Sequence, residues 1–205
     1  MLGGALFPLA ALIHPNGEDL AAVNMPNWVP AHLLGLVSVT LIHLGLIGLY
    51  ARQVEETGWL GLVGFVLAFV GGAFASTTQY VTSTVIPLIA AQAPALFDQA
   101  MTPPPFAPPV FVLGFVLGHV LFGLATMRAG VLPHWSGLLM MIGIVLFFVG
   151  EVSFLAQRLA VPALQQVFEL IRRLRVIVLF GDVAFGLGLV WMGYALWSEK
   201  RALAR

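Results

Sequence analysis

The sequence predicts an all-α polytopic membrane protein, a bundle of five full transmembrane helices preceded by one short N-terminal helix. Of its 205 residues, 60% are hydrophobic and only 9% are charged, whereas a soluble domain typically carries about 25% charged residues. So few charges cannot cover a globular surface, so lipid has to cover it instead. Helix is the expected spanning structure, because unpaired backbone amides in lipid cost several kcal/mol each. We expect a single domain over residues 1–205.

The N-terminal segment MLGGALFPLAALIHP is apolar but short. As a helix it would be roughly 20 Å long, less than the ~30 Å thickness of the hydrocarbon core. It lacks the basic first part and the small-residue cleavage site of a signal peptide. We therefore expect a short, partial or tilted helix here.

Five later segments each supply the roughly 20 mostly apolar residues that a membrane crossing needs. Tryptophan stands at the ends of several of them, where its amphipathic ring favours the membrane interface. The segments run approximately over 28–51, 59–86, 109–127, 135–157 and 174–197, and the tryptophans are Trp28, Trp59, Trp135 and Trp197.

The distribution of basic residues predicts the orientation. Arg52 and Arg128 follow the first and third segments, and Lys200 follows the fifth, whereas the loops 14–27 and 98–109 contain no Lys or Arg. The positive-inside rule then places the basic ends in the cytoplasm and the two loops outside. Arginines within 158–175 oppose this orientation, and the helical spacing of apolar residues in 164–175 predicts an amphipathic helix on the membrane surface.

A polar tract ends the second segment. Residues 75–84, ASTTQYVTST, contain eight hydroxyl or amide side chains. Intramembrane ionisable groups are costly and tend to face a cavity or a partner, and helical rise places several of them near the same outer level. We predict a polar pocket there that binds a small apolar or amphipathic ligand. Its expected residues are His32, Ser76, Thr77, Gln79, Tyr80, Glu151, Arg175 and Asp182.

A purely structural interpretation of these polar groups stands beside the pocket. Ser and Thr in membrane helices often donate to carbonyls of their own helix, and Glu151 and Asp182 could pair with nearby arginines. The glycine-rich spacing of Gly64, Ala68 and Gly72 indicates close helix packing.

Two deeper histidines define an alternative function, a redox subunit that binds haem b. His43 and His119 could coordinate the iron from neighbouring helices, although their depths differ by about 6 Å. A histidine bonded to a hydroxyl on the next helix is the competing interpretation. His14 and His134 are expected to be solvated in loops. No HxxxH or HExxH spacing is present, so no metal site is expected.

Other function classes find no support in the sequence. The absence of cysteine excludes thiolate metal sites, and the formal net charge of zero gives no electrostatic case for nucleic acid. No phosphate-binding loop or nucleophile elbow occurs, so no reaction is indicated and enzymatic activity stays open. Membrane lipid is the expected partner. A third hypothesis is an accessory subunit that assembles with other subunits or with copies of itself.

Two segments resemble a known group of sequences. RAGVLPHWSGLLMMIGIVLFFVG (128–150) and GLYARQVEETGWLGLVGFVLAFVG (48–71) are similar to the small multi-span bacterial membrane proteins of unknown function of the DUF4386 type. Arg128, Pro133 and Trp135 match the turn of that pattern. The resemblance implies a location in the bacterial inner membrane and carries no catalytic residues.

Overall fold

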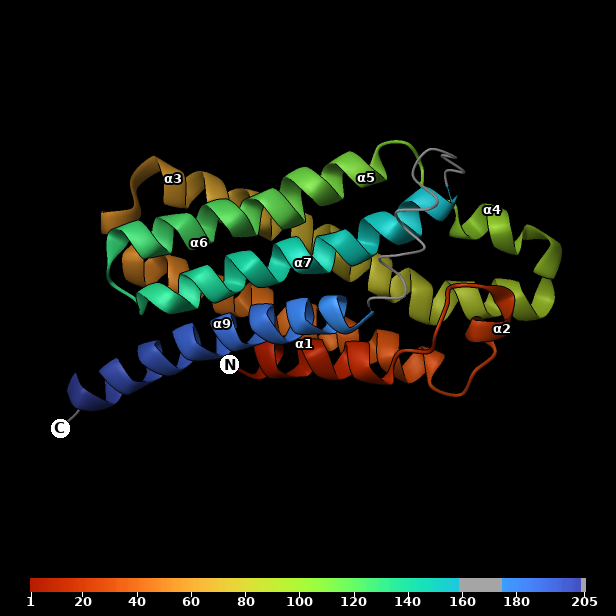
Figure 1. The fold of residues 1–205 in the computed structure, drawn as a ribbon, viewed down its shortest axis with the longest axis horizontal. Helices are drawn as coiled ribbons and strands as arrows, with labels where there is room; N and C mark the ends of the chain where they lie inside the picture. Colours follow the sequence, from red (N-terminus) through yellow and green to blue (C-terminus); the bar gives the residue numbers. More distant parts are fainter. Residues whose placement is uncertain (159–174, 204–205) are drawn as a thin grey trace.

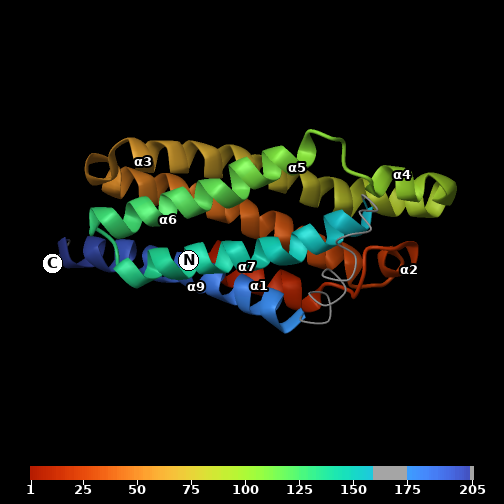
Figure 2. The ribbon, with the colours of Figure 1, turned by 45° about the horizontal axis from the view of Figure 1, so that its top comes forward.

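The computed structural model describes residues 1–158 and 175–203, with side chains for residues 1–149 and 178–199. Every regular element in this part is helical, which confirms the all-α prediction. The long helices lie side by side along one axis (Figures 1 and 2). They are α1 (Leu2–Ile13), α2 (Leu20–Val23), α3 (Trp28–Gln92), η1 (Pro94–Leu96), α4 (Phe97–Met101), α5 (Ala107–Val110), the π-helical η2 (Phe111–Val116), α6 (Leu117–Ala129), α7 (His134–Arg158) and α9 (Arg175–Leu203).

The long helix α3 is a hairpin of two antiparallel arms. Its chain direction reverses at Gly58, whose backbone angles (φ 55°, ψ −151°) are non-helical and strained for any side chain other than glycine. Contacts between the arms pair residues on either side of this turn. The rings of Tyr50 and Phe65 stack with centroids 4.5 Å apart, and the indole of Trp28 donates to the carbonyl of Thr82. The two arms correspond to the first two predicted segments.

The remaining helices also follow the predicted segments. Residues 107–129 form one helical rod made of α5, η2 and α6, and α7 and α9 cover the fourth and fifth segments. The N-terminal segment forms α1, whose 12 residues span about 18 Å. The amphipathic helix predicted over 164–175 lies almost entirely outside the described residues.

Glycines let the helices pack backbone against backbone. A Cβ built on Gly71 of α3 would lie 2.0 Å from the amide nitrogen of Phe115, and one on Gly143 of α7 would lie 2.1 Å from that of Phe185 in α9. Gly64 and Ala68 face Phe122 and Gly118 in the same way. The predicted packing role is therefore confirmed for this part of the small-residue row.

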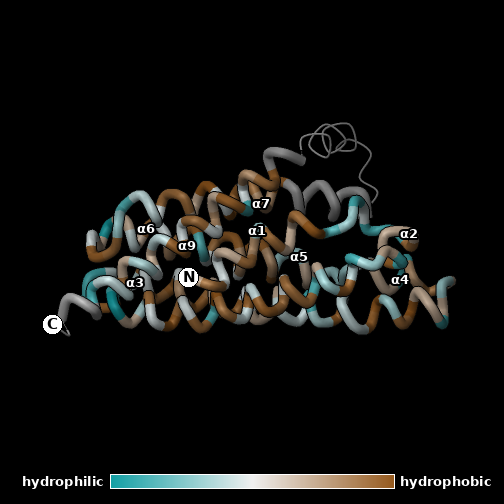
Figure 3. Tube along the Cα trace, turned by 90° about the horizontal axis from the view of Figure 1, so that it is seen from below, coloured by the Kyte–Doolittle hydropathy of each residue, from teal (hydrophilic) through white to brown (hydrophobic). Residues whose placement is uncertain are grey.

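Apolar residues predominate along the middle of the helices, and hydrophilic residues become more frequent toward the two ends of the bundle (Figure 3). Three helical stretches are long and apolar enough to cross a membrane, namely Trp28–Gln92, Ala107–Ala129 and Val178–Glu199. Trp59 and Trp135 are exposed, as expected for interfacial rings. The same expectation is wrong for Trp28, which is fully buried in a small core with Ile86 and Phe97.

The bundle has two chemically different ends. We call the end with residues 14–27 and 92–101 the α2 end, and the opposite end, with residues 52–59 and 128–135, the Gly58 end. At the Gly58 end, Arg52 pairs with Glu199 of α9 at 2.8 Å, and the buried amide of Gln53 donates to the hydroxyl of Thr126. The α2 end holds the acidic loop that follows α1.

Candidate metal centre

The loop between α1 and α2 brings two distant histidines together at the α2 end. α1 ends at Ile13, and Asn27 donates a 2.7 Å hydrogen bond from its amide to the carbonyl of Ile13. This bond satisfies a carbonyl that the end of a helix leaves free and ties the two ends of the loop together. Gly17 turns the chain with a φ of 106°, and Asp19 caps α2 by accepting from the amide of Ala22.

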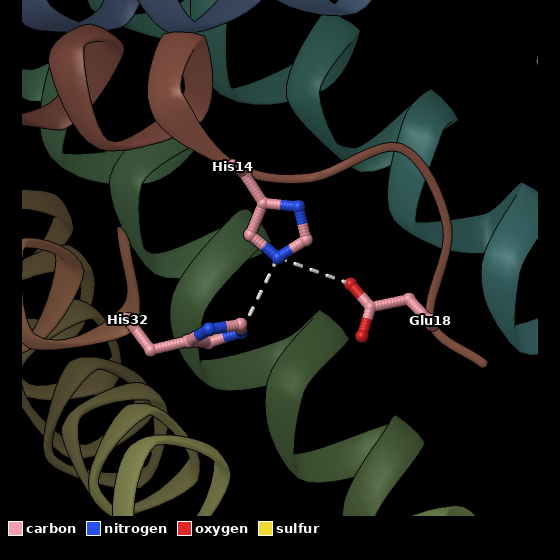
Figure 4. Close-up of side chains that lie close together, drawn as sticks. All are labelled: His14, Glu18 and His32. Carbon is pink, nitrogen blue, oxygen red and sulfur yellow. Dashed lines mark hydrogen bonds and ion pairs between the residues drawn. The ribbon is translucent and has the colours of Figure 1, made fainter. Parts of the chain in front are cut away.

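His14, Glu18 and His32 converge on one point (Figure 4). The Nε2 atom of His14 lies 3.3 Å from Nε2 of His32 and 3.3 Å from a carboxylate oxygen of Glu18. All three of these atoms lie within 4.8 Å of one another. His32 is buried near the start of α3, and the other two side chains are half-buried in the loop. The three residues therefore form a compact cluster at the polar boundary of the bundle.

Backbone carbonyls orient both rings of the cluster. Nδ1 of His14 lies 2.8 Å from the carbonyl oxygen of Pro15, and Nδ1 of His32 lies 2.9 Å from that of Trp28. A carbonyl only accepts, so each Nδ1 carries the proton and donates it. In the neutral rings, Nε2 of His14 then presents its lone pair toward Nε2 of His32 and toward the carboxylate of Glu18. A proton on one of the rings, or a metal ion, would bridge these acceptor atoms.

The spacing of the donor atoms suits a tetrahedral metal ion. Zinc binds histidine nitrogen at about 2.0–2.1 Å, which puts two ligand atoms about 3.4 Å apart across a tetrahedral edge. The separations from His14 Nε2 to His32 Nε2 and to the Glu18 carboxylate are both 3.3 Å, and the third separation, between His32 and Glu18, is within 4.8 Å. The Nδ1 bonds to carbonyls also match metal-binding histidines, which commonly donate their second nitrogen in this way to fix the ring.

Aromatic packing against Trp28 holds the cluster in place. The indole of Trp28 lies 4.4 Å from the His32 ring and 5.5 Å from the His14 ring, centroid to centroid. Its own position is fixed by full burial and by the hydrogen bond to Thr82. Trp28 therefore couples the cluster to both arms of α3.

A shallow depression of about 370 Å³ adjoins the cluster. Its wall combines polar groups from the loop with apolar side chains from α1, α9 and the segment before α3. The lining residues are Ala11, Leu12, His14, Pro15, Asn16, Met25, Asn27 and Leu179. His14 thus belongs both to the cluster and to the wall of the depression.

The polar tract of α3 lies at the same end but does not line this depression. The hydroxyls of Thr77, Thr78 and Thr82 donate to carbonyls four residues earlier in their own helix. Tyr80 is 55% exposed on the outside of the bundle, and Ser76 is half-buried. These contacts match the structural interpretation of the tract.

Gln79 differs from the rest of the tract, since it points inward. A Cβ on Gly35 would lie 3.0 Å from the side-chain amide of Gln79, so the glycine makes room for it. Its Oε1 atom is buried without a hydrogen-bond partner among the described residues. The inward amide faces the first arm of α3, and not the His14 cluster.

The other predicted pocket residues divide into two groups. Asp182 is buried in α9, three residues after Leu179, which lines the depression. Glu151 lies in α7 and Arg175 begins α9, but both side chains fall outside the part of the chain that the structure describes. Of the predicted pocket residues whose side chains the structure describes, His32 alone lies in the cluster.

His43 and His119 do not fit a haem between them. Nδ1 of His43 lies 2.6 Å from the carbonyl of Val39, and its Nε2 lies 3.1 Å from that of Phe69. A Cβ on Gly72 would lie only 1.9 Å from the same Nε2, so no iron can approach this nitrogen. The competing interpretation, a bond to a hydroxyl, also differs, because the partners are backbone carbonyls.

His119 is held among aromatic rings. It is fully buried, with ring centroids 4.7 Å from Phe115 and 5.1 Å from Phe185. Its Nδ1 donates to the carbonyl of Phe115, while Nε2 has no hydrogen-bond partner among the described residues. This histidine therefore acts as a packed core residue.

Sequence reasoning missed two residues of the cluster, because it expected His14 only as a solvated loop residue and did not single out Glu18. The sequence does not show how the loop folds, and this fold brings His14 back to His32 near the start of α3. One signal was available in HPNGE (14–18), where a histidine and a glutamate stand four residues apart around a Pro–Asn–Gly turn.

No family model, curated protein or solved structure matches the chain. The resemblance to DUF4386-type proteins therefore stays a prediction.

Proposed function

We propose that the chain crosses the bacterial inner membrane five times and binds a divalent transition-metal ion at its non-cytoplasmic end. The five crossings would be the two arms of α3, the rod 107–129, α7 and α9. Arg52 and Arg128 lie at the Gly58 end, and the positive-inside rule favours that end in the cytoplasm. The α2 end, with its acidic loop, would then face outward.

The metal would be held by Nε2 of His14, Nε2 of His32 and the carboxylate of Glu18. The observation that carries the proposal is the convergence of these three donors, with both rings oriented by carbonyls at Nδ1. Two imidazoles and one carboxylate suit zinc and similar borderline cations. Glu18 stands in a loop, so its side chain can move the short distance needed to complete the site.

The proposal predicts that metal binding depends on the cluster and on no other histidine of the surface. The test is calorimetric titration of the purified, chelator-treated protein in detergent with Zn²⁺. We expect one site per chain in the wild type, and loss of that site in His14→Ala and in Glu18→Gln.

His134→Ala is the matched control. His134 was also expected to be a solvated loop residue, but it begins α7 at the Gly58 end, and its Nδ1 faces a backbone carbonyl, that of Met127. This variant should bind Zn²⁺ like the wild type. Equal binding by the wild type and by His14→Ala would refute the proposed site.

A further inference from the structure

The proposed ion keeps at least one coordination position free. Three protein ligands are typical of zinc sites that bind water or a further ligand at the fourth position, whereas closed structural sites use four protein ligands. One of the three ligands, His14, also forms part of the wall of the depression. A molecule in the depression therefore lies against the metal site.

The ligand chemistry of the ion selects the head of such a molecule. Zinc and similar cations bind carboxylate oxygen as well as imidazole nitrogen. A carboxylate is therefore a suitable further ligand for the free position. Asn16 and Asn27 add polar side chains to the same wall.

The apolar part of the wall selects the tail. Leu12 and Met25 are both exposed large hydrophobic residues of the α2 end, and Leu179 of α9 closes the wall beside them. The volume of about 370 Å³ is at the small end of the range for ligand sites. A short hydrocarbon chain fits this space, and a whole phospholipid does not.

We propose that the depression binds a small amphiphile whose carboxylate head coordinates the ion beside His14 and whose hydrocarbon tail lies on Leu12, Met25 and Leu179. This inference rests on the proposed metal site and names the ligand class of that site. The amphiphile reaches the depression from the outer leaflet or from the adjacent water.

The test uses the protein loaded with Co²⁺, whose visible absorption reports changes in its ligands. Octanoate, acetate and octanol are the three probes, because they separate the head from the tail. We expect octanoate to change the spectrum at a concentration at least about tenfold lower than acetate, since its tail is removed from water. Octanol, which lacks the anionic head, should leave the spectrum unchanged.

Two matched variants locate the tail. Leu179→Trp fills the depression, and it should weaken octanoate binding at least about fivefold while acetate binding stays constant. Leu187→Trp places the same side chain at an exposed position of α9 away from the depression, and it should behave like the wild type.

The outcomes separate the two proposals. Binding of Co²⁺ with equal responses to octanoate and acetate, or with no effect of Leu179→Trp, overturns the amphiphile site and leaves the metal site standing. No binding of Co²⁺ or Zn²⁺ by the wild type overturns the metal site and, with it, the ligand class inferred from it.

Discussion

The two histidine pairs of this bundle share residue types and one hydrogen bond, and they differ at the second ring nitrogen. In all four rings, Nδ1 lies within hydrogen-bond distance of a backbone carbonyl. In His14 and His32, the two Nε2 atoms face each other and a carboxylate. In His43, Nε2 faces a carbonyl and a glycine, and in His119 it lies among aromatic rings.

The comparison shows that the surroundings of Nε2, and not depth in the membrane, separate a binding site from a packed core. The deeper pair looks more unusual in the sequence, because intramembrane histidines are costly. Yet the helices close around it through Gly72 and Phe185. The shallower pair keeps one half-buried ring, that of His14, because a loop and a helix start meet there.

The largest effect is expected when one histidine of each pair is replaced by alanine and the two variants are compared. His32→Ala should weaken Zn²⁺ binding by more than the roughly 100-fold that losing a hydrogen-bond partner of a metal ligand can cost. His119→Ala should keep the Zn²⁺ affinity but lower the apparent melting temperature, because it leaves a cavity in the fully buried core. Zinc titration and thermal unfolding of both variants check this. The comparison fails if His119→Ala loses the metal and His32→Ala retains it.

The second prediction concerns the glycine that closes the deeper site. Gly72→Ala places a Cβ 1.9 Å from Nε2 of His43, and it should lower the free energy of unfolding by roughly 1–3 kcal/mol. Combining it with His43→Ala should recover part of the loss.

Gly45→Ala serves as its control, because nothing lies within 4 Å of a Cβ there. On helix propensity alone it should be neutral or stabilising by up to about 1 kcal/mol. If both glycine substitutions lowered the free energy of unfolding equally, the contact with His43 would not be the cause of the loss in Gly72→Ala.

These two predictions also show what the sequence could and could not reveal. Apolar run length located the helices, since the bilayer sets that length, and small residues such as Gly64 indicated the close packing. The burial of Trp28 and the convergence of His14 on His32 depend on how the loop 14–27 folds, which no periodicity encodes. The hydroxyl tract lies at the α2 end, but the hydroxyls of Thr77 and Thr82 donate to carbonyls of their own helix.

A smaller effect is expected where Trp28 supports the shallow pair. Trp28→Phe keeps an aromatic ring under His32 but removes the 2.9 Å bond from the indole to the carbonyl of Thr82. The loss of one hydrogen bond should lower the free energy of unfolding by about 1 kcal/mol. Zinc affinity should fall only slightly, and calorimetry would contradict this support role if affinity were lost completely.

The smallest effect belongs to the hydroxyl tract. Thr77→Val removes an exposed hydroxyl that donates only to Ala73 of its own helix. Unfolding free energy should change by less than about 0.5 kcal/mol, and the response to octanoate should not change. A clear loss of octanoate binding would contradict this prediction and show that the tract belongs to the ligand site.

The most direct measurement is X-ray absorption at the zinc edge of the Zn²⁺-loaded protein. The account predicts a first shell of nitrogen and oxygen at about 2.0–2.1 Å with scattering from two imidazole rings. His43→Ala should give the same spectrum, and His14→Ala should lose one imidazole or the metal itself. A spectrum without imidazole scattering, or one that His14→Ala leaves unchanged, would contradict the assignment of the ion to His14, Glu18 and His32.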